Sequence, residues 1–138
     1  GGTTVLNDNK AFVRDFFKSF SDGDLEATKA MMDGSHVYYF PLADAPMDKE
    51  NHSNVQAVFK AAIPDLHDQI AEDDKVASRF TATGTFTNEF QGLPPSGERI
   101  EFSGTNVMRI VDGKSLEEWD DFDTMALMGQ LCAIHTHH

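Results

Sequence analysis

The spacing of the hydrophobic residues changes once along this chain, close to Pro64. Before Pro64, apolar residues recur every three or four positions, which is typical of amphipathic helices. After it, β-branched and aromatic residues are concentrated in long runs, which favours strands. Helices followed by hairpin-linked strands predict an α+β fold, in which the helices cover one face of an antiparallel sheet.

The first part of the chain predicts three helices. Residues 7–20 carry one wide apolar stripe, and Gly23 supplies a left-handed stop after them. A second, short helix is expected over residues 25–32. A third is expected over residues 54–63, with Ser53 as its cap and Pro64 as its end.

The second part predicts strands joined by turns. Asp112-Gly113 is a strong hairpin signal between two of them. Gly84 lies inside another and indicates a bend or bulge. With a short strand before Pro41, the expected strands are 36–40, 66–71, 76–87, 100–111 and 116–123. Residues 125–131 form a short apolar end segment.

Charge narrows the range of partners. The 138 residues include 11 Lys and Arg against 23 Asp and Glu, a formal net charge of −12. An acidic chain repels phosphate backbones and anionic lipids, so nucleic-acid and membrane-surface roles are disfavoured. We expect one domain over residues 1–138, with flexible ends at 1–5 and 132–138, and a cytoplasmic location because no targeting pattern is visible.

Neither a metal nor a cofactor is expected. Cys132 is the single cysteine, which excludes a disulfide within the chain. His36, His52 and His67 lie far apart in the sequence, and no His pair at metal-binding spacing occurs outside the histidine-rich tail. No Gly-rich phosphate loop precedes a helix, and no Gly-x-Ser-x-Gly frame is present.

Several motifs follow one another in an order that resembles a known family. They are Pro64-Asp65-Leu66-His67, Arg79-Phe80-Thr81-Ala82-Thr83-Gly84-Thr85, Gly92-Leu93-Pro94-Pro95-Ser96-Gly97, Asp112-Gly113-Lys114, Glu117-Glu118-Trp119 with Asp123, and Gln130-Leu131. Together they resemble the SnoaL-like polyketide cyclases, also described as predicted ester cyclases. The resemblance extends from about Phe16 to Leu131.

This resemblance implies a cone-shaped α+β fold. In it a curved, mostly antiparallel sheet is closed by three N-terminal helices around a deep apolar pocket. Nuclear transport factor two and ketosteroid isomerase share the fold and do unrelated things, so the fold alone does not fix the function. The characterised cyclases close a ring by an intramolecular aldol reaction without metal or organic cofactor.

Asp123 is the first catalytic candidate. The resemblance implies an aspartate acid/base four residues after a tryptophan, which matches Trp119 and Asp123. Strand alternation puts both on one face, and we expect that face to point inward. A carboxyl group in an apolar pocket has a raised pKa, as proton transfer near neutral pH requires. The other interpretation is a solvated acid at the end of a strand.

His67 is the second catalytic candidate, as a group that orients the carboxylate or contacts a substrate oxygen, with a structural histidine as the alternative. Arg79 either binds a substrate oxygen or forms a structural salt bridge. The remaining expected substrate-binding residues are apolar pocket lining, with plain core packing as the alternative: Trp119, Phe86, Met108, Tyr39 and Phe20.

Three functions remain open on the sequence. The first is a cyclase or isomerase that uses an aspartate acid/base. The second is a non-catalytic binder of a small apolar or aromatic molecule, which two departures from the family favour: Phe86 stands where histidine is frequent, and the strand Asn106–Arg109 lacks a pocket histidine. The third is hydratase or dehydratase chemistry. We also expect a homodimer that packs through the outer face of the sheet.

Overall fold

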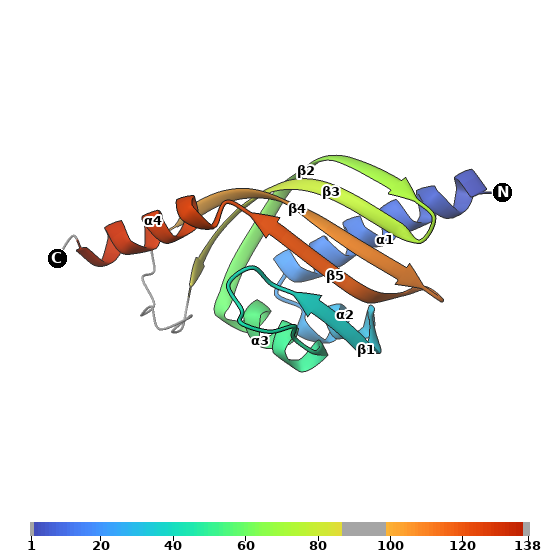
Figure 1. The fold of residues 1–138 in the computed structure, drawn as a ribbon, viewed down its shortest axis with the longest axis horizontal. Helices are drawn as coiled ribbons and strands as arrows, with labels where there is room; N and C mark the ends of the chain where they lie inside the picture. The colour runs from blue at the N-terminus through green and yellow to red at the C-terminus, as the bar shows by residue number, and fades with distance from the viewer. Residues whose placement is uncertain (1, 87–98, 137–138) are drawn as a thin grey trace.

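The computed structural model describes residues 2–86 and 99–136. Figure 1 shows the N-terminal helices on one side of a curved sheet and the C-terminal helix extending from its end. In chain order the elements are α1 (Gly2–Ser21), α2 (Leu25–Ala30), β1 (Met32–Tyr39), α3 (Lys49–Val58), β2 (Phe59–Glu72), β3 (Lys75–Phe86), β4 (Ile100–Val111), β5 (Lys114–Phe122) and α4 (Thr124–Thr136).

In the described residues the sheet has five strands in the order β1-β5-β4-β3-β2. Strands β2 to β5 form an antiparallel meander, because each pairs with the next one along the chain. Only β1, at the edge, runs parallel to its neighbour β5. The α+β fold with a mostly antiparallel sheet is therefore confirmed.

Helix α1 closes the concave face of the sheet through its apolar stripe. Val13, Phe16 and Phe17 are buried on this helix and pack against Val76 and Met108 of the sheet. A second core cluster lies toward α4 and consists of Phe80, Ala82, Ile100, Phe102 and Leu127. Full burial of an apolar side chain of this size contributes about 1.5–3 kcal/mol, so these clusters hold the helices and sheet together.

The third helix does not follow the sequence prediction. The expected helix over 54–63 is wrong at both ends, since α3 starts at Lys49 and ends at Val58. The backbone N–H of Asn51 donates to the Asp48 carboxylate at 2.9 Å, so Asp48 caps the helix in place of Ser53. Pro64 lies within β2, where the pairing with β3 shifts register between Ala62 and Asp65, and an irregular position tolerates its missing N–H.

Helix α4 follows the last strand where we expected only a short apolar segment. Asp123 follows β5 directly, and α4 starts at the next residue. The buried side chain of Leu127 fixes α4 against β3 and β4. Among the described residues, no helix has both the length and the apolar character that a membrane crossing needs.

Candidate functional site

A cavity lies between the helices and the concave face of the sheet. Most of the wall is aromatic or aliphatic: Phe16, Phe17, Phe20, Phe40, Val55, Phe80, Ala82, Phe102, Phe122 and Leu127. Four polar side chains complete it: Tyr38, His52, Glu118 and Asp120. An apolar chamber with a few polar groups is the usual form of a small-molecule site.

Strand β5 supplies two of these polar groups. Successive side chains of a strand point to opposite faces, so Glu118, Asp120 and Phe122 share the inner face and line the cavity. Trp119 and Asp121 lie on the other face. A register shift in the pairing of β4 with β5, between Arg109 and Ile110, sets this alternation.

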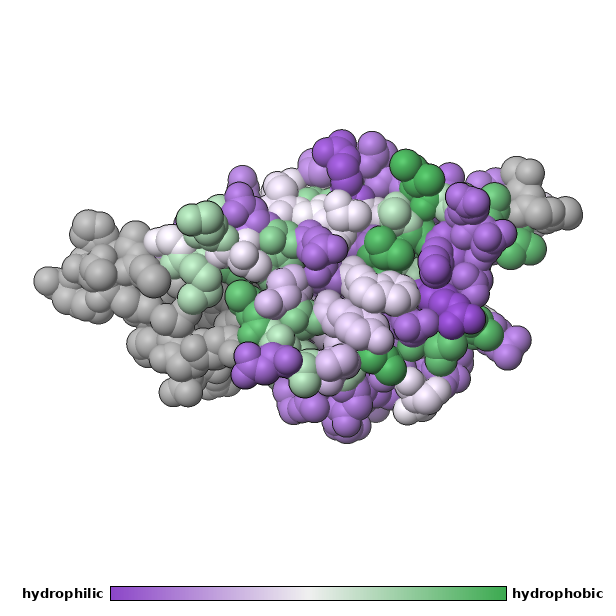
Figure 2. All heavy atoms as spheres, viewed as in Figure 1, coloured by the Kyte–Doolittle hydropathy of each residue, from purple (hydrophilic) through white to green (hydrophobic). Residues whose placement is uncertain are grey.

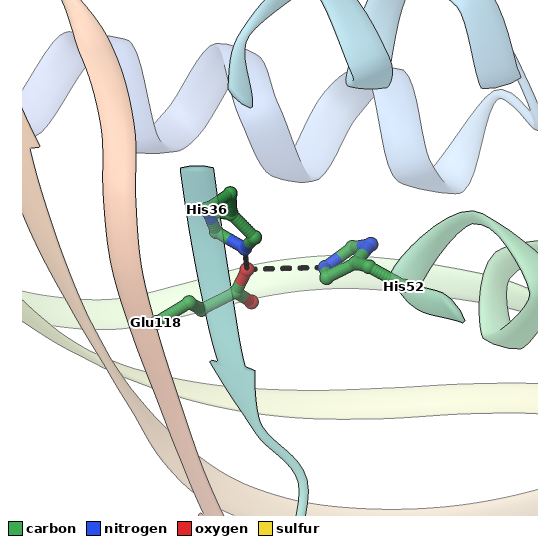
Figure 3. Close-up of side chains that lie close together, drawn as sticks. All are labelled: His36, His52 and Glu118. Carbon is green, nitrogen blue, oxygen red and sulfur yellow. Dashed lines mark ion pairs between the residues drawn. The ribbon is translucent and has the colours of Figure 1, made fainter. Parts of the chain in front are cut away.

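Glu118 is the centre of a buried charged cluster. Its Oε1 atom lies 3.0 Å from His52 Nε2 and 3.5 Å from His36 Nε2, and all three side chains are almost fully buried. In Figure 3 the two imidazoles, from β1 and α3, point at the same carboxylate oxygen of β5. The Nδ1 atom of His36 lies 3.0 Å from the carbonyl oxygen of Ser115, which fixes the orientation of that ring.

Asn106 on β4 joins Glu118 to Asp120. Its Nδ2 atom donates to Glu118 Oε2 at 2.9 Å and to Asp120 Oδ1 at 2.7 Å. Asp120 Oδ2 accepts a hydrogen bond from the hydroxyl of Tyr38. The two carboxyl groups are thus held by one amide, and Asp120 is clamped between Asn106 and Tyr38.

The surroundings shift the pKa of the two acids in opposite directions. Burial and the nearby Glu118 charge raise the pKa of Asp120 to about 7. Burial would also raise the pKa of Glu118, but the charges and contacts of His52 and His36 outweigh it and hold the pKa at about 2. For His52, burial opposes the charged form, yet the Glu118 charge prevails and the pKa is raised.

The cluster of His36, His52 and Glu118 consists of residue types that also ligate metals, and their ligand atoms all lie within 4.8 Å of one another. His52 forms an ion pair with Glu118 Oε1, the same carboxylate oxygen that His36 Nε2 approaches at 3.5 Å, so we describe the group as a charge cluster.

The structure gives Asp123 a different place from the inward one we expected. Its side chain is exposed, and its carboxylate accepts the backbone N–H of Ala126 at 2.9 Å. Asp123 therefore caps α4, and the expectation that it faces the pocket is wrong. Because the alternation of β5 turns Glu118 and Asp120 inward, Trp119 lies on the outer face.

Trp119 and Tyr39 lie together outside the cavity. Their rings stack with centroids 5.4 Å apart and planes 5° apart. They line a shallow outer hollow together with Asp120 and the loop residues Pro41 and Pro46. Trp119 is partly buried, as expected, but it borders this hollow instead of the deep cavity.

The other candidates are scattered over the fold. His67 is exposed, with its Nε2 atom 2.7 Å from the hydroxyl of Thr81. Arg79 forms an exposed ion pair with Asp68 at 2.9 Å. Phe20 lines the cavity, whereas Met108 is fully buried in the core cluster around Val13. The side chain of Phe86 lies outside the described part of the structure.

Sequence reasoning missed the polar residues that do gather here: His36, Tyr38, His52, Asn106, Glu118 and Asp120. One signal could have found two of them. Alternate residues of a strand share a face, so either the face with Glu118, Asp120 and Phe122 or the face with Trp119 could point into the cavity. The family pattern of an aspartate four residues after a tryptophan favours the face that contains Trp119 and Asp123, and the sequence does not show that Tyr39 stacks on Trp119 on the outside of the sheet.

The comparisons with known proteins agree with this architecture. Residues 10–131 match the family of SnoaL-like polyketide cyclases. The chain belongs to this family. The structure of AclR from Streptomyces galilaeus, a proposed hydroxylase, is 25% identical, with a TM-score of 0.77 over 93% of this chain and 83% of that one.

Two further solved structures of this fold are similar. IdmH from Streptomyces antibioticus, a proposed polyketide cyclase, is 29% identical, with a TM-score of 0.72 over 89% of this chain and 97% of that one. A proposed SnoaL-like polyketide cyclase from Jannaschia sp. CCS1 is 21% identical, with a TM-score of 0.78 over 91% and 92% of the two chains. No curated protein matches the sequence.

Proposed function

We propose that this protein is an enzyme that transfers a proton next to a carbonyl group, with Asp120 as the general acid/base. The observation that carries the proposal is one carboxyl group at the polar end of an aromatic cavity, with a pKa raised to about 7. A group with a pKa near the working pH can both take and return a proton. Membership of the family supports a reaction of the cyclase or isomerase type.

The reaction would use the two forms of Asp120 in turn. The carboxylate removes a proton from a carbon next to a carbonyl, and the electron pair moves onto the carbonyl oxygen to give an enolate. The enolate carbon then forms a bond to a ketone carbon of the same molecule. The resulting alkoxide takes the proton back from Asp120, so the product is an isomer of the substrate and the enzyme is regenerated.

The cavity walls would supply the second contribution to catalysis. A flexible chain with two ketones has many open conformations, and few of them bring the reacting carbons together. Aromatic walls such as Phe16, Phe80 and Phe102 would hold it folded, with its reacting end against Asp120. Such proximity is a large part of the advantage of an intramolecular reaction.

Binding without catalysis is the second candidate, because an aromatic chamber of this kind also suits a carrier or sensor of apolar molecules. The convergence of Tyr38, Asn106 and Asp120 favours the enzyme, since a binder of apolar ligands needs no clamped carboxyl group there. Hydratase chemistry would use the same carboxyl group on a water molecule.

The test is Asp120→Asn with an aryl β-keto ester that carries a tethered ketone, with ring closure followed by NMR. We expect turnover to fall about 10²–10⁴-fold. Calorimetry should show that the variant still binds the substrate, because the apolar walls are unchanged. The matched control is Asp121→Asn, whose side chain is exposed on the opposite face of β5 and should leave turnover intact. Wild-type turnover by Asp120→Asn would contradict the proposal.

A further inference from the structure

The proposed role of Asp120 does not explain why the nearby carboxylate of Glu118 is buried. Glu118 is 2% exposed and lies two residues before Asp120 on the same face of β5. Burial of an ionised carboxylate is costly unless it is paired. A chain that needed only a packed wall at this position would carry an apolar residue, so the charge calls for an explanation.

We propose that Glu118, held ionised by His52 and His36 and tied to Asp120 through Asn106, is a positioning residue whose negative charge makes Asp120 hold its proton more strongly. This inference rests on the proposed acid/base function of Asp120. It adds that the charge of Glu118 sets the pH range in which Asp120 can act as an acid/base.

The first step of the argument is the charge of Glu118. Its Oε1 atom is approached by two imidazoles, at 3.0 Å from His52 and 3.5 Å from His36, and all three side chains are almost fully buried. A buried charge with a close partner of opposite sign is poorly screened, so the pair holds its charges over a wide pH range. Glu118 is therefore a fixed negative charge inside the fold.

The second step is the link to Asp120. The same Nδ2 group of Asn106 donates to both carboxyl groups, at 2.9 and 2.7 Å. It prevents Glu118 and Asp120 from moving apart to relieve their repulsion. A second negative charge on Asp120 is opposed by its fixed neighbour, so Asp120 retains its proton to higher pH.

Other groups face Asp120 from the surrounding elements. Tyr38 on β1 donates to it, and His52 on α3 lies beyond Glu118. Asp44 and Asp121 line the outer hollow with Asp120, but both are exposed and water screens their charges. Tyr38, Asn106 and His52 favour the carboxylate, whereas burial and Glu118 favour the acid, and the acid prevails.

The experiment compares two variants with opposite expected effects. Glu118→Gln removes the fixed negative charge and should lower the titration midpoint of Asp120 by roughly 1–3 pH units. His52→Gln removes a nearby positive charge, while His36 still faces the Glu118 carboxylate and keeps it ionised, so this variant should raise the midpoint. A purely structural role would loosen the site in both variants and move the midpoint in one direction. Because His52→Gln gives a result on its own, the test survives if Glu118→Gln fails to fold.

The midpoint is read by NMR with carboxyl-labelled aspartate, and the Asp120 signal is assigned by its loss in Asp120→Asn. The matched control is Glu117→Gln, since Glu117 pairs with Arg109 at 3.0 Å and should leave the midpoint unchanged. An unchanged midpoint in Glu118→Gln, or shifts of equal sign in both variants, would overturn the inference. Activity of Asp120→Asn is measured separately, so the inference and the proposed function can fail independently.

Discussion

Asp120 and Asp123 lie three positions apart, and their surroundings separate them. Asp120 is clamped by Asn106 and Tyr38 beside the cavity, whereas Asp123 is exposed and bonded to the backbone of Ala126. A carboxylate at a helix N-cap satisfies a free N–H and interacts favourably with the helix dipole. The structure thus assigns Asp123 a part in stability.

Removal of this cap gives the first prediction. Asp123→Ala should lower the free energy of unfolding by about 1 kcal/mol and leave turnover unchanged. Asp123→Ser, which keeps a capping oxygen, should recover most of the loss. Urea denaturation followed by fluorescence measures both. A large loss of turnover at unchanged stability would instead restore Asp123 to the active site.

The family resemblance predicts Asp123 as the acid/base, whereas the structure places Asp120 beside the cavity and Asp123 at the start of α4. Alternation allows two faces, and the choice depends on what covers each face. Trp119 lies outside because Tyr39, a residue of the parallel edge strand, stacks on it. His36 and His52 reach Glu118 from elements far away in the sequence, and no local spacing predicts such a meeting.

At the scale of elements, β4 and β5 must approach closely for the site to form. Gly104 on β4 faces the end of β5, where an added Cβ would lie 2.5 Å from the carbonyl oxygen of Asp121 and 2.7 Å from the Cβ of Phe122. These atoms belong to the backbone or lie next to it, so no side-chain rotation can move them away. A side chain at this position therefore has to separate the two strands.

Gly104→Ala should accordingly destabilise the protein by about 1–3 kcal/mol, the usual cost of overpacking. Because the displaced segment carries Asp120, turnover should also fall. Gly34→Ala is the matched control, since a Cβ there meets nothing within 4 Å. Equal thermal midpoints for the two variants would contradict the close approach of the strands.

The elements themselves were predictable to different degrees. The strand over 100–111 was predicted with the observed bounds, because an alternating pattern and the Asp112-Gly113 turn define it locally. The predicted position of the third helix is wrong because Pro64 is typical of a helix end, whereas in the structure Pro64 occupies an irregular position of β2. Proline marks the loss of an N–H in either structure, and only the neighbouring strand decides between them.

At the scale of the whole molecule, the outer face of the sheet is the surface through which we expect a homodimer. Ile70 on this sheet is 73% exposed and lines a hollow with Ala77 and Val107. Figure 2 shows hydrophobic and intermediate residues among hydrophilic ones on the visible face. Exposed apolar residues of a sheet favour association with a second copy.

Light scattering at micromolar concentration should therefore give about twice the chain mass of 15.3 kDa. Salt should strengthen the dimer, because each chain carries a net charge of −12 and the two copies repel each other. Ile70→Asp should weaken it, whereas Val5→Asp, at an exposed position of α1, should not. A monomer mass for the wild type would contradict this expectation.

Glu118 and Asp120 also shape the pH dependence of the whole fold. Glu118 has a pKa of about 2 in the folded protein against an ordinary 4.5, so its contribution to stability is lost as the pH falls from about 4.5 toward 2. Asp120 is the reverse case, because its pKa is about 7 in the folded protein against an ordinary 3.8. The stability linked to its bound proton is lost as the pH rises from about 4 to 7. His52, whose pKa is raised above 6.5, adds a further loss as the pH rises beyond that value.

These opposite slopes predict a stability maximum near pH 4–5, on the acid side of neutrality. Each proton that the folded state retains changes stability by at most about 1.4 kcal/mol per pH unit. Urea unfolding at pH 3, 5 and 8, followed by the fluorescence of the single tryptophan, Trp119, measures the curve. Asp120→Asn should flatten the decline between pH 5 and 7, whereas Asp121→Asn should retain it. A stability that rises from pH 5 to pH 8 would contradict this prediction. It would mean that Asp120 is already ionised well below neutral pH in the folded protein, because an acid that is ionised in both the folded and the unfolded state does not make stability depend on pH.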